Sequence, residues 1–86
     1  MITENSVIVT VIYFVGADQR EQDFELPYDI PVGPLSVEFF SFLDENGLLS
    51  FSNKYYYFYC EKRRLQSDKT LRENQIYDGN ILTVAP

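Results

Sequence analysis

The chain has 86 residues, which is enough for one small domain with a single hydrophobic core. Hydrophobic residues make up 45% of it and aromatic residues 16%, a composition typical of a folded globular protein. Seven basic and thirteen acidic residues give a net charge of −6. Because nucleic acids and anionic membranes both need clustered positive charge, we expect neither as a partner.

Targeting and redox features narrow the location of the protein. No apolar run approaches the roughly 20 residues that a membrane-spanning helix needs. No basic residue precedes the apolar stretch Val7–Val15, so the layout of a signal peptide is missing. Cys60 is the one cysteine, which excludes an internal disulfide and fits a reducing compartment. We therefore expect a cytoplasmic protein without direct membrane insertion.

A β-hairpin is predicted at the start of the chain. The segment Val7–Val15 favours a strand because β-branched and aromatic residues dominate it. Side chains alternate between the two faces of a strand. The inward set is Val7, Val9, Val11 and Tyr13, and the outward set is Ile8, Ile12 and Phe14. After a turn over residues 16–19, Arg20–Pro27 is predicted to be the second strand, with Phe24 and Leu26 inward.

Acidic residues mark the second half of this hairpin, namely Asp18, Glu21, Asp23 and Glu25. One interpretation is a charged surface for a partner. The simpler interpretation is a solvated edge strand, because charges on an edge strand discourage pairing with another chain.

A helix is predicted to begin at Pro34, because proline at the first helical position gives up no hydrogen bond. The core-facing residues recur at helical spacing and are Val32, Leu35, Phe39, Phe42 and Leu43. The segment Asp44–Gly47 ends the helix, with Gly47 or Asn46 as its left-handed cap. Val37 and Phe40 fall outside this stripe, either as a second contact surface or packed against Leu48–Phe51.

The run Tyr55–Cys60 is the most unusual segment, and its aromatic side chains favour a strand. Tyr56, Phe58 and Cys60 are predicted to face the core, and Tyr55, Tyr57 and Tyr59 the other side. The assignment depends on the pairing register of this strand, because a shift by one residue would exchange the two faces.

Shorter elements complete the chain. A charged turn at Glu61–Arg64 precedes a very short predicted strand at Leu65-Gln66. Thr70 and Glu73 have the spacing of a capping box at one helical turn. The last strand is predicted at Asn80–Ala85, after the turn Asp78-Gly79, with Leu82 and Val84 inward. The fold class is therefore α+β, a mixed five-stranded sheet packed on one helix, with the first and last strands as parallel neighbours at its centre.

The segment Arg64–Val84 (RLQSDKTLRENQIYDGNILTV) resembles the closing third of ubiquitin-like β-grasp domains. Those domains share a short strand, a "T-L" turn, a buried isoleucine before a "D-G" turn, and a terminal strand in this order. The residues at the corresponding core positions are Leu65, Leu71, Ile76, Leu82 and Val84. The resemblance implies a single ubiquitin-like domain over residues 1–86.

More narrowly, Asp23–Pro27 (DFELP) followed by Pro31-Val32 and Leu35 is similar to the small bacterial YukD/EsaB family. Members of that family are ubiquitin-like proteins of type VII (ESX/Ess) secretion systems. The resemblance implies a cytoplasmic accessory or regulatory component whose partners are secretion-machinery proteins or their regulators. Two alternatives remain open, a generic ubiquitin-like adaptor and a cytosolic domain excised from a larger secretion-system membrane protein.

Residues for catalysis are scarce. The sequence ends in Thr83–Pro86 without the Gly-Gly pair through which ubiquitin is conjugated, so a conjugated modifier is not expected. One cysteine cannot hold an iron–sulfur cluster, and the absence of histidine removes most zinc and nucleophile–histidine arrangements. We expect no enzyme activity, no metal and no cofactor, which leaves non-covalent protein binding as the predicted function.

The predicted contact surface is the outer face of the sheet, because large exposed apolar patches mark contact sites. Its predicted residues are Tyr55, Tyr57, Tyr59, Ile8, Ile12, Ile81, Arg63 and Arg64, with Thr83 beside them. The occupant would be a foreign protein or a second copy of the chain. The alternative is that loops cover these side chains. Arg63 and Arg64, with Lys62, would steer an acidic partner or simply form a solvated turn, and Cys60 is most simply a small core residue.

Overall fold

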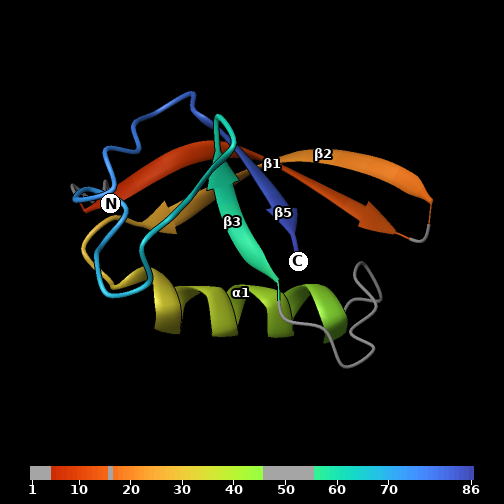
Figure 1. The fold of residues 1–86 in the computed structure, drawn as a ribbon, viewed down its shortest axis with the longest axis horizontal. Coiled ribbons are helices and arrows are strands. Elements are labelled where there is room, and N and C mark those ends of the chain that lie inside the picture. Colours follow the sequence, from red (N-terminus) through yellow and green to blue (C-terminus); the bar gives the residue numbers. More distant parts are fainter. Residues whose placement is uncertain (1–4, 16, 46–55) are drawn as a thin grey trace.

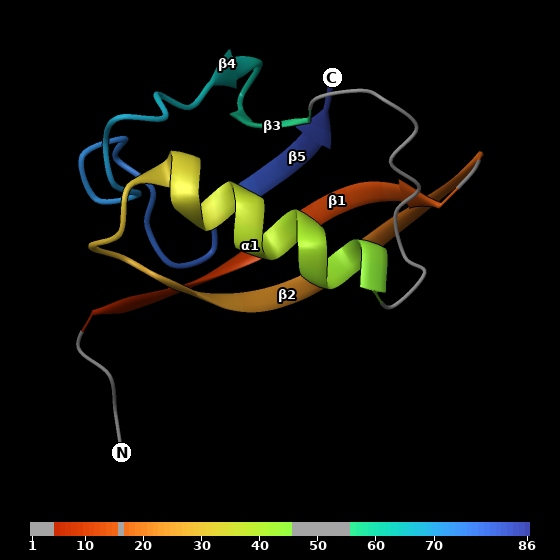
Figure 2. The ribbon, with the colours of Figure 1, turned by 90° about the horizontal axis from the view of Figure 1, so that it is seen from below.

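The computed structural model describes residues 5–15, 17–45 and 56–86. One helix lies across one face of a five-stranded sheet, as Figures 1 and 2 show from two directions. The strand order is β2-β1-β5-β3-β4, with β1 and β5 parallel and the other pairs antiparallel. This mixed α+β arrangement confirms the predicted fold class, including the parallel central pair. The elements are β1 Ser6–Val15, β2 Asp18–Pro27, α1 Val32–Glu45, β3 Tyr57–Cys60, β4 Arg63–Arg64 and β5 Ile81–Ala85.

The alternation predicted for β1 is confirmed. Its predicted inward residues, Val7, Val9, Val11 and Tyr13, are all buried. Strand β2 pairs with β1 from Ser6↔Pro27 to Val15↔Asp18 and begins at Asp18, two residues before the predicted start. The paired part of β2 therefore reaches back to Asp18, well beyond Phe24 and Leu26, which are the two β2 side chains that contact the core.

Helix α1 begins at Val32 rather than at Pro34. Four predicted core residues, Val32, Leu35, Phe39 and Leu43, are buried. The prediction is wrong for two phenylalanines, because Phe42 is 47% exposed and Phe40 only 7%. The side of α1 that carries Phe40 faces β3, and the Phe40 ring centroid lies 5.2 Å from that of Phe58. The predicted cap at Asn46 or Gly47 and the segment Leu48–Phe51 lie outside the described residues.

Strand β3 has the predicted phase. Phe58 and Cys60 are buried, and Tyr56, just before the strand, packs against the core. The predicted strand at Leu65-Gln66 is wrong, since β4 is Arg63–Arg64. Glu61 and Lys62 both have positive φ, 52° and 68°, so they form a two-residue hairpin turn and pairing resumes at Arg63.

The closing segment packs as predicted. Leu65, Leu71, Ile76, Leu82 and Val84 are all buried. The capping box is also confirmed: the Thr70 N–H donates to Glu73 Oε1 and the Glu73 N–H donates to Thr70 Oγ1, both at 3.0 Å.

Gln75 ends this helical turn with φ of 63°. The Ile76 N–H donates to the Leu71 carbonyl and the Gln75 N–H to the Arg72 carbonyl, both at 3.0 Å, which is the bonding pattern of a Schellman cap. Because glycine takes this left-handed conformation without steric cost, we expect Gln75→Gly to raise the free energy of unfolding by about 1 kcal/mol. Chemical denaturation measures this difference.

Gln66 is the matched control, since it is an exposed glutamine of the same segment that is not among the positive-φ residues. We expect Gln66→Gly to lower stability slightly through backbone entropy. Equal effects of the two substitutions would contradict the assignment of Gln75 as the cap.

Candidate protein-binding site

The face of the sheet opposite α1 brings one residue of every strand into a single row. Ile12 pairs with Glu21 on one side and with Thr83 on the other, and Tyr59 joins Thr83 to Arg64. Paired residues share a face of the sheet. The row therefore runs acid, aliphatic, polar, aromatic, base from β2 to β4. We call this surface the outer face.

Apolar side chains stand exposed along the outer face. Ile8 is 53% exposed, Ile81 51% and Tyr57 38%, while Ile12 and Tyr59 are half-buried. Phe14, two residues beyond Ile12 on β1, is exposed as well. Helix α1 covers the other face of the sheet in Figures 1 and 2. Exposed aromatic and aliphatic groups in one patch favour a contact surface.

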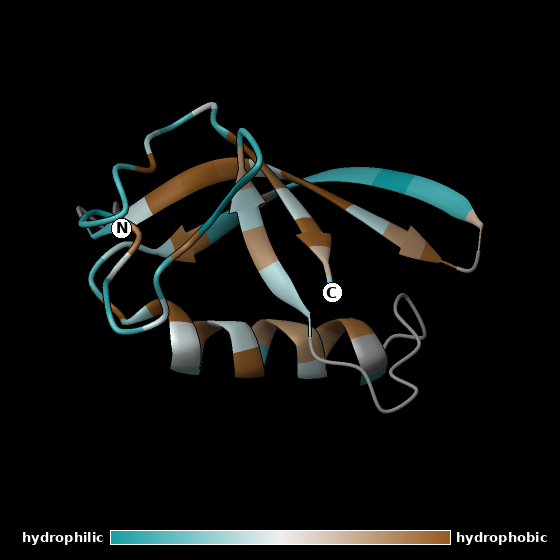
Figure 3. Cartoon of the chain, in the orientation of Figure 1, coloured by the Kyte–Doolittle hydropathy of each residue, from teal (hydrophilic) through white to brown (hydrophobic). Residues whose placement is uncertain are grey.

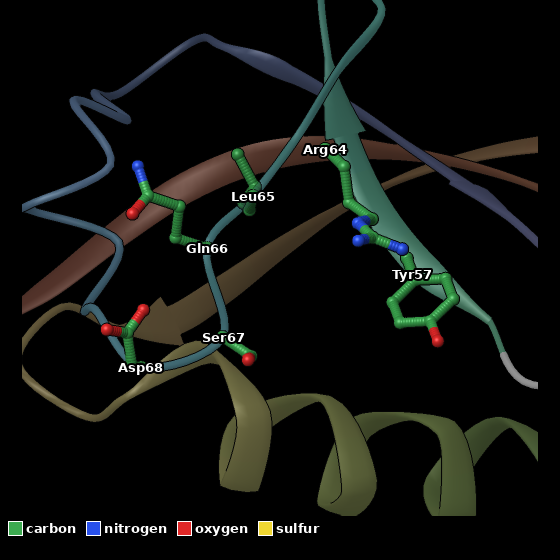
Figure 4. Close-up of a pocket in the computed structure, with 6 residues that line it drawn as sticks. All are labelled: Tyr57, Arg64, Leu65, Gln66, Ser67 and Asp68. Atoms are coloured by element: carbon green, nitrogen blue, oxygen red, sulfur yellow. The ribbon is translucent and has the colours of Figure 1, made fainter.

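Two tyrosines are fixed in position by the polypeptide around them. The guanidinium carbon of Arg64 lies 4.6 Å from the centroid of the Tyr57 ring, a cation–π contact that Figure 4 shows beside a shallow pocket. The Tyr59 hydroxyl donates to the carbonyl of Pro86 at 3.0 Å. Both rings are thereby held on the outer face with part of their surface in solvent.

The structure brings six of the eight predicted contact residues to this face, namely Ile8, Ile12, Ile81, Tyr57, Tyr59 and Arg64. Arg63 differs, because it pairs with the inward-facing Cys60 and so belongs to the opposite face. Its Nη2 donates to the Asn74 carbonyl at 3.1 Å, which ties β4 to the closing segment. Tyr55 lies outside the described residues.

Phe14 was missed as a member of the site. The alternation that assigns Ile8 and Ile12 to the outer face assigns Phe14 there too, so the signal was present in the sequence. Glu21 was predicted within the acidic set of the hairpin, either as a charged surface for a partner or as part of a solvated edge strand, and the register with β1 places it on the outer face opposite Ile12.

The acidic residues of β2 are exposed, and two of them bond to hydroxyl groups of β1. Thr10 Oγ1 donates to Asp23 Oδ1 and Ser6 Oγ donates to Glu25 Oε2, both at 2.6 Å. Figure 3 shows β2 as largely hydrophilic beside the more hydrophobic β1 and β5. One border of the outer face is therefore acidic.

No group of three potential metal ligands occurs among residues 5–15, 17–45 and 56–86, and no helix in that part of the chain is long and apolar enough to cross a membrane. Burial, and then the neighbouring Glu61 carboxylate, raise the pKa of the Cys60 thiol. The thiolate is disfavoured, which fits a small core residue.

No family model matches, and no curated protein matches. Several solved structures are similar to this chain in fold. The ubiquitin-like domain of the Mycobacterium tuberculosis type VII secretion protein EccD1 is 22% identical with a TM-score of 0.69, over 94% of this chain and 98% of that one. The ubiquitin of Caldiarchaeum subterraneum is 14% identical with a TM-score of 0.68, over 92% of this chain and 90% of that one.

The chain has the ubiquitin-like β-grasp fold. A third similar structure, a chain of the MycP5-free ESX-5 inner membrane complex, is 21% identical with a TM-score of 0.67. The alignment covers 94% of this chain but only 21% of that one, so the ubiquitin-like domain corresponds to a small part of the longer chain. The fold predicted from the segment Arg64–Val84 is thereby confirmed.

Proposed function

We propose that this ubiquitin-like domain is a non-covalent protein-binding module that acts as an accessory or regulatory component of a bacterial type VII secretion system. It works in the cytoplasm, recruited to the inner face of the cell membrane by protein contacts. The observation that carries the proposal is the exposed apolar patch on the outer face, to which Tyr57, Ile81 and Ile8 contribute.

Two physical features support binding through this face. When a partner covers exposed apolar groups, the free energy falls by about 25 cal/mol for each Å² of apolar surface removed from water. Tyr57 adds a ring that Arg64 already holds in place, so less side-chain entropy is lost when a partner packs on it. The outer face is therefore better prepared for a partner than the exposed side of α1, where Val37 is 67% exposed.

The secretion-system assignment has separate support. The DFELP segment and the residues after it resemble the YukD/EsaB family, as described above. The similarity in fold to a ubiquitin-like domain of a type VII secretion protein agrees with that resemblance.

Two alternatives are each favoured by one comparison. The likeness to the ubiquitin of Caldiarchaeum subterraneum favours a generic ubiquitin-like adaptor that is unrelated to secretion. The match to a short part of an inner-membrane complex chain favours a cytosolic domain of a larger membrane protein.

Co-purification tests the proposal. The tagged full chain is expressed in a host with a type VII system, and membranes are solubilised in mild detergent. We expect the wild-type chain to capture the membrane complex of the secretion system that contains its ATPase, called the membrane ATPase complex below. We expect Tyr57→Thr with Ile81→Thr to reduce the captured amount about tenfold or more, because central apolar contacts dominate interfaces. Threonine keeps the strand preference of both positions.

Val37→Thr is the matched control, since it removes an exposed apolar side chain on the other side of the molecule. It should leave capture unchanged, and thermal melts should show all variants folded. Capture that is lost in the control and kept in the outer-face variant would contradict the proposed surface. Failure of the wild-type chain to capture the complex would favour the generic adaptor.

A further inference from the structure

The outer face carries opposite charges at its two borders. On the β2 side, Glu21 and Asp23 pair with the outward residues Ile12 and Thr10. On the β4 side, Arg64 pairs with Tyr59, and the adjoining turn holds Lys62 beside Glu61, so this border keeps a net positive charge. The apolar side chains lie between these borders.

This layout is complementary to itself. Strand β5 is the middle strand of the sheet, with β1 and β2 on one side and β3 and β4 on the other. Consider two copies packed face to face about a twofold axis that follows β5. The operation places β2 of each copy over β4 of the other, so Glu21 lies against Arg64 of the second copy. The two acidic borders then meet the two basic borders.

The same twofold rotation also brings apolar residues of the two copies together. Ile81 and Thr83 lie on β5 and meet their own equivalents at the axis. Phe14 on β1 and Tyr57 on β3 lie on opposite sides of β5, so each approaches the other across the interface. A twofold axis that instead followed the row would stack Glu21 on Glu21 and Arg64 on Arg64. Like charges disfavour that arrangement, so the charges select one orientation.

We propose that the outer face joins two copies of this chain in a symmetric dimer, with Glu21 of each copy against Arg64 of the other. The inference rests on the proposed function of the outer face as a contact surface and adds a second copy as an occupant, so the dimer and the secretion complex compete for the same face. Two sheets packed in this way lie about 10 Å apart, with side chains interdigitating between them. The contact is isologous and therefore closes at two copies.

The dimer is expected to be weak. Five strands span roughly 24 Å, and a five-residue strand such as β5 spans roughly 17 Å. This footprint is small beside the roughly 800 Å² that each partner contributes to a standard interface. Self-association should therefore depend on protein concentration and needs measurement up to roughly 1 mM.

Charge reversal with mixing tests the geometry. Sedimentation equilibrium of the full chain should show a monomer–dimer equilibrium. Glu21→Arg and Arg64→Glu should each weaken it about tenfold or more, because each creates two like-charge contacts. An equimolar mixture of the two single variants should recover dimer, since both cross-contacts in the mixed pair are then Arg against Glu. The variant that carries both changes should also recover it.

Glu38→Arg on α1 is the matched control, since it changes the net charge as Glu21→Arg does but lies away from the outer face. It should dimerise like the wild-type chain. A wild-type chain that stays monomeric to roughly 1 mM, or a mixture that stays monomeric, would overturn the dimer. Capture of the secretion complex by such a monomer, with loss in Tyr57→Thr, Ile81→Thr, would leave the proposed function intact.

Discussion

Replacing Phe58 with alanine should lower the free energy of unfolding by about 3–5 kcal/mol, the largest stability effect that we expect for a single substitution. The Phe58 side chain is 1% exposed. Its ring lies between α1 and the sheet, 5.4 Å from the ring centroid of Phe39 and 5.2 Å from that of Phe40. Truncation leaves a cavity between these rings. Since a small domain has only about 5–15 kcal/mol of total stability, a large part of it would be lost.

Phe42→Ala is the matched control for this experiment. Phe42 belongs to the same helix as Phe39 and contacts the Phe24 ring at 6.5 Å, but it is half-exposed. We expect a loss of about 1 kcal/mol for Phe42→Ala. Urea denaturation of both variants measures the difference. Equal losses would mean that the burial of Phe58, and with it the orientation of β3, is wrong.

Asn74→Ala should have the next largest effect, a loss of about 2–4 kcal/mol in the free energy of unfolding. Asn74 is the one buried polar side chain among the described residues. The Gln66 N–H donates to Asn74 Oδ1 at 2.9 Å, and Asn74 Nδ2 donates to the carbonyls of Gln66 and Thr70 at 3.1 and 2.8 Å. Alanine would leave the Gln66 N–H without its partner and would remove one of the two hydrogen bonds to each carbonyl, since the Lys69 N–H still donates to Gln66 and the Asn74 N–H still donates to Thr70.

Asn80→Ala is the control, because the Asn80 amide accepts one backbone hydrogen bond, from the Tyr77 N–H at 2.7 Å, in a half-buried turn. The loss there should be about 1 kcal/mol. Thermal unfolding of both variants separates the two cases. If Asn74→Ala cost no more than Asn80→Ala, the amide network of Asn74 would not be what orders the segment Gln66–Gln75.

Much of the fold could be predicted because alternation and spacing were unambiguous in several elements. In β1 and β5 the inward positions follow from period two, and the buried Val9, Val11 and Leu82 agree with it. Alternation alone could not give the phase of β3, because both of its faces are aromatic; the phase rested on an inward Leu65, and Leu65 is buried. The capping box at Thr70 and Glu73 is a local pattern, so it needed no knowledge of the tertiary structure.

Other features depended on tertiary structure and could not be predicted. Four apolar residues crowd the second half of α1, and only the position of β3 decides that Phe40 rather than Phe42 is buried. Glu61-Lys62 lacks the Asn-Gly signature of a two-residue turn, so the start of β4 at Arg63 was hidden. That start determines which of Arg63 and Arg64 reaches the outer face. The burial of Asn74 depends on backbone groups that only the folded segment brings together.

Isoleucine methyl groups give the most direct test of the outer face as the binding surface. Ile8, Ile12 and Ile81 lie on it, Ile30 is exposed but outside the sheet, and Ile76 is buried. NMR spectra of the methyl-labelled full chain would be recorded with and without the solubilised membrane ATPase complex. The account predicts shifted or broadened signals for the three outer-face residues and unchanged signals for Ile30 and Ile76. Perturbation of Ile30 with unchanged Ile8, Ile12 and Ile81 would contradict it.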